Sequence, residues 1–199
     1  ARAKAIATGR QSLTGVSAFP LLGDDGVTVA PPRTAPPVGG TQMVRPLVPH
    51  RLAEPFEALR DAADAHAAKT GQEPKVFLAS LGPVIEHTTR STWVKNYLAA
   101  GGIAVLSSDG YASAEEAAKA FQTSGATAAC LSSSDALYAE HAEATARALK
   151  TAGARLVLMA GRPGAQEAAL TAAGVDQFLF QGADAVATLK GLQAKLGIS

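Results

Sequence analysis

Five short apolar runs alternate with five alanine-rich stretches between residues 76 and 196, and this alternation restricts the folds open to the chain. The apolar runs have the length of buried strands and lie at 76–81, 103–107, 127–131, 156–160 and 177–180. The alanine-rich stretches predict helices at 88–100, 114–124, 136–152, 165–173 and 183–196. Strands that are apolar on both faces are typical of a parallel sheet covered by helices on both sides. We therefore expect an α/β fold.

Capping residues support this division into strands and helices. A glycine follows each of the five predicted helices, where a left-handed residue can end a helix: Gly101, Gly125, Gly153, Gly174 and Gly197. Ser113 and Glu116 have the spacing of a capping box at the start of the helix at 114–124. A further helix at 52–69, with Pro55 tolerable in its first turn, leads into this domain.

Right-handed crossovers and one chain reversal after the first strand predict a doubly wound sheet with strand order 2-1-3-4-5. In such a sheet ligands bind where the carboxyl ends of the first and third strands lie side by side. The residues expected at this edge are Gly82, Glu86, His87, Ser132, Ser133 and Ser134. The loop after the first strand, holding Glu86 and His87, is thus the main candidate for chemistry.

Each of these residues also has an ordinary structural interpretation. A lone histidine beside a glutamate usually forms local hydrogen bonds, and no cluster of Cys, His and Asp at ligand spacing indicates a metal site. The serines before Asp135 are most simply the N-cap of the following helix. No glycine-rich phosphate motif follows the first strand, which disfavours a nucleotide site. A phosphoacceptor receiver domain would carry a lysine at the end of the fifth strand, where Phe180 and Gln181 stand.

The N-terminal quarter differs from the rest, because eight of the eleven prolines fall between Pro20 and Pro55. Residues 21–50 are predicted to be a Pro/Gly-rich extended linker. Before it, residues 1–10 have the pattern of a helix end stopped at Gly9, and residues 12–19 that of a short strand. We expect residues 1–20 to be the tail of another domain, and residues 51–199 to form the α/β domain.

Charge and composition exclude several classes of partner. The formal net charge is +1, and the basic residues are scattered, so no nucleic-acid partner is indicated. No apolar run approaches the roughly 18 residues that a membrane span needs. The single cysteine, Cys130, lies in an apolar run and is predicted to be a small buried side chain in a reducing, cytoplasmic compartment.

Two separated segments resemble one family. The segment at 81–92, LGPVIEHTTRST, looks like the small, non-catalytic (beta) subunit of heterodimeric methylmalonyl-CoA mutases. Residues 1–20 look like the exit from that family's TIM barrel. Residues 74–197 resemble the C-terminal cobalamin-binding domain of acyl-CoA mutases, which implies a flavodoxin-like five-stranded sheet. The resemblance implies an adenosylcobalamin-dependent isomerase whose large catalytic subunit is the partner of this chain.

The resemblance also identifies the residues of a degenerate cofactor site. Cobalamin-binding members carry the motif D-x-H-x-x-G after the first strand, where the histidine coordinates cobalt and the aspartate orients it. Aligned to that motif, His87 takes the histidine position, Ile85 the aspartate position and Arg90 the glycine position. Ser132 and Ser134 stand at the family's later motif after the third strand, and Gly161 at its motif after the fourth. Gly82 belongs to the same degenerate site. Ile85 cannot accept an imidazole proton, and Arg90 would enter the space of the cofactor's nucleotide tail.

We therefore expect this chain to bind no cofactor and no metal, to carry no catalytic residue, and to stabilise and orient the large subunit that holds adenosylcobalamin. An alternative is a cobalamin carrier or chaperone module that uses His87. A catalytic isomerase in its own right lacks support, because radical chemistry needs an enclosing barrel. Trp93 and Tyr97, an i, i+4 pair on the first helix, are weak candidates for partner contacts.

Overall fold

A computed structural model describes residues 1–23, 30 and 50–198. Its centre is a five-stranded parallel sheet in the order β2-β1-β3-β4-β5, as the sequence predicts. The strands are β1 (Lys75–Ser80), β2 (Ala104–Leu106), β3 (Ala128–Ser132), β4 (Leu156–Ala160) and β5 (Gln177–Leu179). The three inner strands are almost entirely buried, which explains their unbroken apolar sequence.

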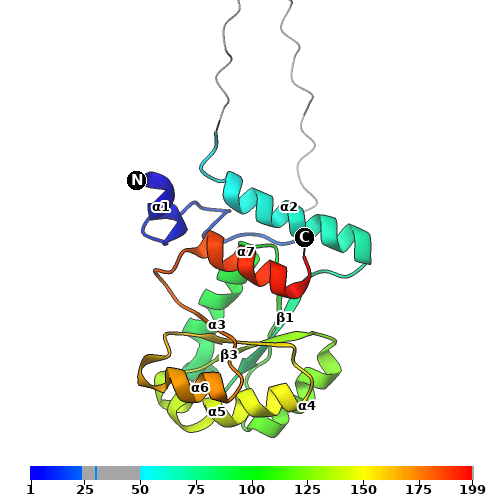
Figure 1. Cartoon of the computed structure of the whole chain (residues 1–199), viewed down its shortest axis with the longest axis vertical. Helices are drawn as coiled ribbons and strands as arrows, with labels where there is room; N and C mark the ends of the chain where they lie inside the picture. The colour runs from blue at the N-terminus through cyan, green and yellow to red at the C-terminus, as the bar shows by residue number, and fades with distance from the viewer. Residues whose placement is uncertain (24–29, 31–49, 199) are drawn as a thin grey trace, which may run out of the picture.

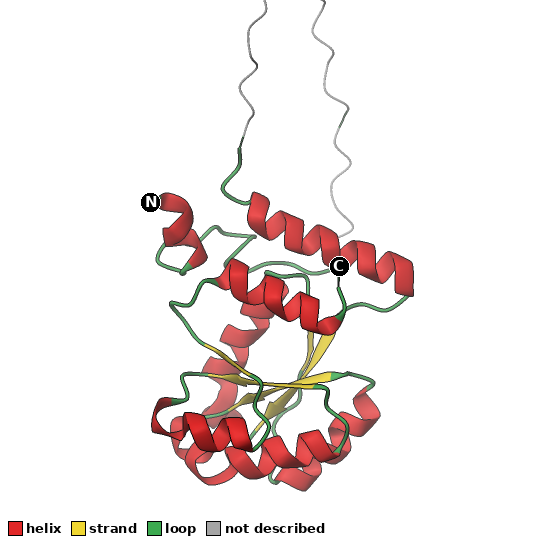
Figure 2. Ribbon diagram, in the orientation of Figure 1, coloured by secondary structure: helices red, strands yellow, loops and turns green. Residues whose placement is uncertain are grey.

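Helices cover both faces of the sheet (Figures 1 and 2). The helices are α1 (Arg2–Ala7), α2 (Glu54–Thr70), α3 (Val84–Ala99), α4 (Ala114–Ser124), α5 (Asp135–Thr151), α6 (Glu167–Ala172) and α7 (Ala185–Leu196), with a short 3-10 turn, η1 (Gly164–Gln166), before α6. In Figure 1, α4, α5 and α6 lie on one face, and α3 and α7 lie on the other, with α2 outside α7. Each face has its own apolar core, represented by Phe121 and Leu149 on the first and by Leu98 and Leu189 on the second.

Helix α2 joins the domain through both apolar and polar contacts. Phe56 and Leu59 are buried in the same apolar core as residues of α3 and α7. The side-chain amide of Gln193, on α7, donates hydrogen bonds to the carbonyl oxygens of Leu59 at 2.6 Å and Gly101 at 2.9 Å. This buried amide ties α2, α7 and the end of α3 together.

The N-terminal segment packs on the same face. Ile6, on α1, is 2% exposed and belongs to the core of the α3 and α7 layer. The prediction of a strand at 12–19 is wrong, because these residues form a turn closed by a single bridge between Thr14 and Ala18. Nothing in the structure tests whether residues 1–20 belong to a barrel, and most of the predicted linker at 21–50 lies outside the described residues.

Two helix predictions need correction. The first helix after β1 begins at Val84 with Pro83 as its N-cap, four residues before the predicted start at residue 88. The predicted helix at 165–173 is divided into η1 and α6. Other boundaries agree within two residues. One of the two bonds of the predicted capping box of α4 is formed, since the amide of Glu116 donates to the Ser113 hydroxyl at 3.2 Å. The Glu116 carboxylate accepts from the amide of Ala112, one residue before the N-cap, at 2.9 Å.

Within the described residues, none of the helices combines the length and hydrophobicity that crossing a membrane would require.

Candidate functional site

The carboxyl edge of the sheet brings together most of the residues that the sequence singles out. Ser132 ends β3, Gly82 follows β1, and Gly161 follows β4. His87 and Arg90 come from the first two turns of α3, which packs across this edge. These residues lie at the same edge of the sheet, although the two side chains of α3 lie on a helix and not on a loop.

His87 faces the protein interior and is 4% exposed. Its Nε2 lies 3.2 Å from the carbonyl oxygen of Asp109, so this nitrogen carries the proton and donates it. Its Nδ1 lies 3.1 Å from the hydroxyl of Ser91, which donates to this nitrogen in the tautomer that carries its proton on Nε2. Both ring nitrogens of His87 are therefore engaged inside the chain.

The hydroxyl of Ser91 is the centre of a buried hydrogen-bond network. It lies 3.0 Å from the hydroxyl of Ser132 and 3.3 Å from that of Ser80. Because Ser91 uses its single proton on His87, it accepts from the other two serines. Sequence reasoning missed Ser80 and Ser91, whose only signal was a polar residue at the end of an apolar strand and another one helical turn after His87.

The loop between β2 and α4 closes over His87. A bridge between Leu81 and Tyr111 extends the sheet by one pair, with the amide of Tyr111 donating to the carbonyl oxygen of Ser80 at 2.8 Å. Gly110 has φ +118°, and a Cβ there would meet the carbonyl oxygen of Gly82 and lie 3.0 Å from Nε2 of His87. The backbone thus packs directly against the imidazole ring.

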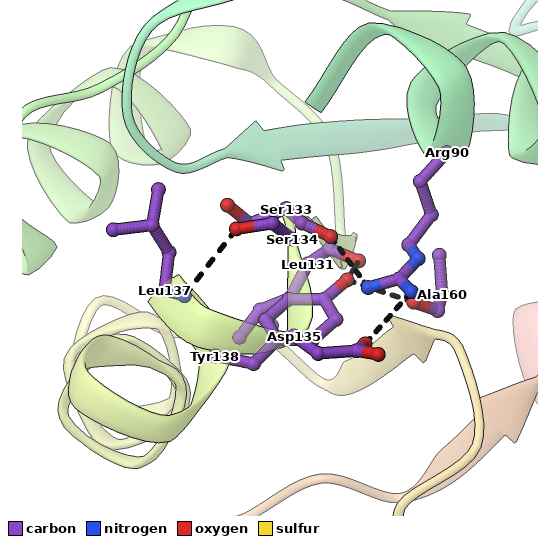
Figure 3. A network of polar contacts seen from close by, with 8 residues as sticks. All are labelled: Arg90, Leu131, Ser133, Ser134, Asp135, Leu137, Tyr138 and Ala160. Carbon is purple, nitrogen blue, oxygen red and sulfur yellow. Dashed lines mark hydrogen bonds and ion pairs between the residues drawn. The ribbon is translucent and has the colours of Figure 1, made fainter. Parts of the chain in front are cut away.

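Arg90 lies across the ends of β3 and β4 (Figure 3). Its guanidinium donates to the carbonyl oxygen of Ser133 at 2.5 Å and to the Asp135 carboxylate at 2.8 Å. It also lies 5.0 Å from the centre of the Tyr138 ring, a cation–π distance. A Cβ on Gly161 would be 3.6 Å from the guanidinium carbon, so Arg90 occupies the space over this glycine.

Tyr138 supports Arg90 from below. Its hydroxyl lies 2.8 Å from the carbonyl oxygen of Ala160 and 3.0 Å from that of Leu131, which links α5 to the ends of β3 and β4 (Figure 3). Burial raises the pKa of the Tyr138 phenol well above its ordinary value. The ring is therefore neutral and fixed.

Of the remaining predicted residues, Ser133 and Ser134 have structural roles, and Ile85 is exposed to solvent. Ile85 is 87% exposed. The hydroxyl of Ser134 accepts from the amide of Leu137 and caps α5, which confirms the simpler interpretation of the serine run. The hydroxyl of Ser133 donates to the carbonyl oxygen of Leu81 at 2.8 Å and holds the loops after β1 and β3 together.

Cys130 and Tyr97 are also buried groups with raised pKa values. Burial raises the pKa of the Cys130 thiol to about 12, so it is an inert core residue, as expected. Burial likewise raises the pKa of Tyr97 to about 12. Trp93 and Tyr97 stack with ring centres 5.0 Å apart and pack on the core, beside the N-terminal segment.

The corrinoid site implied by the resemblance can be tested against these residues. A cobalt ligand needs a free imidazole nitrogen, and a carboxylate usually orients the ring through the other nitrogen. His87 has neither, since serine and a backbone carbonyl occupy its nitrogens and Ile85 points to solvent. Arg90, which the resemblance aligns with the glycine of the motif, has its guanidinium over Gly161. The residues, as arranged, do not fit a corrinoid, and the described part of the chain contains no other cluster of metal ligands.

The site does contain an open cavity beside Arg90. Its volume is about 540 Å³. Its walls come from α3 and from the loops after β3, β4 and β5: Glu86, Thr89, Arg90, Trp93, Ser133, Ser134, Gly161, Arg162, Leu179, Phe180 and Gln181.

Sequence comparison identifies the relatives of this chain. The methylmalonyl-CoA mutase small subunit of Streptomyces virginiae is 46% identical over 198 residues, a match that spans 100% of this chain and 30% of that protein. The chain is homologous to part of the methylmalonyl-CoA mutase small subunit. The small subunit of Propionibacterium freudenreichii subsp. shermanii is 34% identical over 200 residues, and the probable small subunit of Mycobacterium tuberculosis 36% identical over 199 residues.

These small subunits extend well beyond the matched region, since the chain spans only about 30% of the length of the curated relatives. No family model matches the sequence. Among solved structures, a CheY-like protein (TadZ) from Pseudomonas aeruginosa aligns with a TM-score of 0.46 and 24% identity, over 63% of this chain and 94% of its own. The small-subunit relationship therefore rests on sequence.

Proposed function

We propose that this chain is a structural segment of the small subunit of an adenosylcobalamin-dependent mutase and binds no corrinoid itself. In this proposal a large catalytic subunit holds adenosylcobalamin and interconverts methylmalonyl-CoA and succinyl-CoA, while the small subunit stabilises it as a heterodimer. The observation that carries the proposal is the engagement of both ring nitrogens of His87 by Ser91 and Asp109.

The names of the relatives support the partner, because a small subunit implies a large one. The packing is consistent with a structural role, because the polar groups at the carboxyl edge of the sheet form hydrogen bonds between strands, loops and helices of the chain itself. A cytoplasmic location remains a prediction.

The alternative, a corrinoid carrier that uses His87, is favoured only by the histidine's aligned position. It would require His87 to leave its buried site and to break its bonds to Ser91 and Asp109. Each buried group left unpaired costs about 1–3 kcal/mol. Arg90 would also have to release Ser133 and Asp135.

Co-purification separates the two functions. The chain is expressed with the large subunit of its own organism in cells supplied with cobalamin, and the purified material is analysed for protein stoichiometry and for bound corrinoid. The proposal predicts a complex whose corrinoid content matches the large subunit alone. Corrinoid that purifies with this chain in the absence of the large subunit would support the carrier.

A further inference from the structure

The cavity beside Arg90 adjoins the degenerate cofactor site, because Arg90, Ser134 and Gly161 line it, whereas His87 and Ser91 do not. It lies toward β4 and β5, where α3 faces the loops that follow these strands. Its volume of about 540 Å³ is within the range of roughly 300–1,000 Å³ that is typical of small-molecule sites. It is also close to the carboxyl edge where open α/β sheets bind ligands.

Arg162 gives this cavity an uncompensated positive charge. Its guanidinium carbon lies 4.4 Å from the centre of the Phe180 ring, and one of its nitrogens donates to the carbonyl oxygen of Gln181 at 3.3 Å. In the part of the chain that the structure describes, Arg162 has no carboxylate partner. Most of its five N–H donors are therefore available, while the ring holds the group in place.

The other charged groups facing the cavity are Arg90 and Glu86. Arg90 is already paired with Asp135, although guanidinium donors remain. Asp135 compensates Arg90, so the preference for an anion rests on Arg162, which forms no ion pair with a described carboxylate. The rest of the wall includes the aromatic side chains Trp93 and Phe180 and the aliphatic Leu179, which favour a ligand with an apolar body.

We propose that this cavity binds a small organic oxyanion, a phosphate or carboxylate group carried on an apolar ring, with Arg162 as the main anion contact. Arg90 lines the same cavity and adds a second positive charge. The apolar body lies against Trp93 and Phe180. This site shares Arg90, Ser134 and Gly161 with the degenerate cofactor site but does not include His87.

Trp93 provides a built-in probe, because it is the only tryptophan of the chain and lines the cavity. Its fluorescence, excited at the red edge of the indole absorption, is followed during titration with phenyl phosphate, benzoate and uncharged benzyl alcohol. The proposal predicts saturable changes with the two anions and none with benzyl alcohol over the same concentrations. The tighter of the two anions identifies the preferred acid group.

Two arginine variants make the test specific. Arg162→Gln removes the charge-assisted hydrogen bonds between the guanidinium and the anion. We expect this loss to raise the Kd about tenfold or more. Arg147→Gln is the matched control: Arg147 is exposed, pairs with Glu143, and lies about 18 Å along α5 from the cavity end of that helix. Its Kd should equal that of the parent chain.

The proposal is overturned if neither anion gives a saturable change, if benzyl alcohol binds as tightly as the anions, or if Arg162→Gln leaves the Kd unchanged. Circular dichroism of each variant shows that it is folded before titration. Failure of the anions to bind would not bear on the proposal that the chain binds no corrinoid. That proposal is tested separately, by the absorbance of hydroxocobalamin.

Discussion

Replacing Ser91 with alanine tests the buried network most sharply. The substitution removes one oxygen but leaves three groups without partners: Nδ1 of His87 at 3.1 Å and the hydroxyls of Ser132 at 3.0 Å and Ser80 at 3.3 Å. Ser80 and Ser132 are fully buried, and His87 is 4% exposed. Water therefore has little access to replace the lost bonds.

The expected cost follows from this geometry. An unpaired buried polar group costs about 1–3 kcal/mol, and some hydroxyls can turn toward new partners, so Ser91→Ala should destabilise the chain by about 3 kcal/mol. Ser132→Ala is the matched control. It removes a single hydrogen bond and leaves the contact between Ser91 and His87, for an expected cost of about 1 kcal/mol.

Urea unfolding at neutral pH measures both variants. With an m-value of about 2 kcal/mol/M, Ser91→Ala should lower the midpoint by about 1.5 M and Ser132→Ala by about 0.5 M. Equal m-values confirm that the midpoints report stability. Equal midpoints for the two variants, or a Ser91→Ala midpoint within about 0.3 M of the parent chain, would refute the assignment of Ser91 as the centre of the network.

Three further predictions concern the surroundings of the network. Gly110→Ala should cost at least about 2 kcal/mol more than Gly153→Ala, because both glycines have positive φ but only Gly110 has neighbours that a Cβ would strike; similar urea midpoints would contradict this packing. Tyr138→Phe should lower stability by about 1–2 kcal/mol through loss of its buried hydrogen bonds, and an unchanged midpoint would show that they contribute nothing. Because folding raises the pKa of Cys130 to about 12, the folded chain holds this proton where the unfolded chain loses it, and stability should fall as the pH rises above about 9. Midpoints at about pH 8 and about pH 10.5 check this, and Cys130→Ala should lose less stability over that interval; an equal loss would disprove the role of the thiol.

The sheet could be predicted because its signals are local. Apolar runs such as the one that contains Leu78 can only be inner strands, and crossover handedness leaves few strand orders. The early start of α3 was missed, since its first turn contains the β-branched and exposed Val84 and Ile85. Pro83 at the N-cap was the available signal.

The site was predicted in position but not in detail. The switch point identifies which loops meet, so Ser132 and His87 were correctly brought together. The orientation of His87 depends on Asp109, which is 22 residues away, and on a hydroxyl one turn along the helix. The cavity of Arg162 depends on the stacking of its side chain on Phe180, which follows a different strand. Such contacts are set by tertiary packing and have no sequence pattern of their own.

Titration with hydroxocobalamin tests the central claim, that this edge of the sheet is closed to a corrinoid. The absorbance of the corrin is recorded with the parent chain and with His87→Ala, which removes the histidine that the resemblance aligns with the cobalt ligand. We predict identical spectra, with no shift toward an imidazole-coordinated form in either protein. A saturable shift with the parent chain that His87→Ala abolishes would contradict the account.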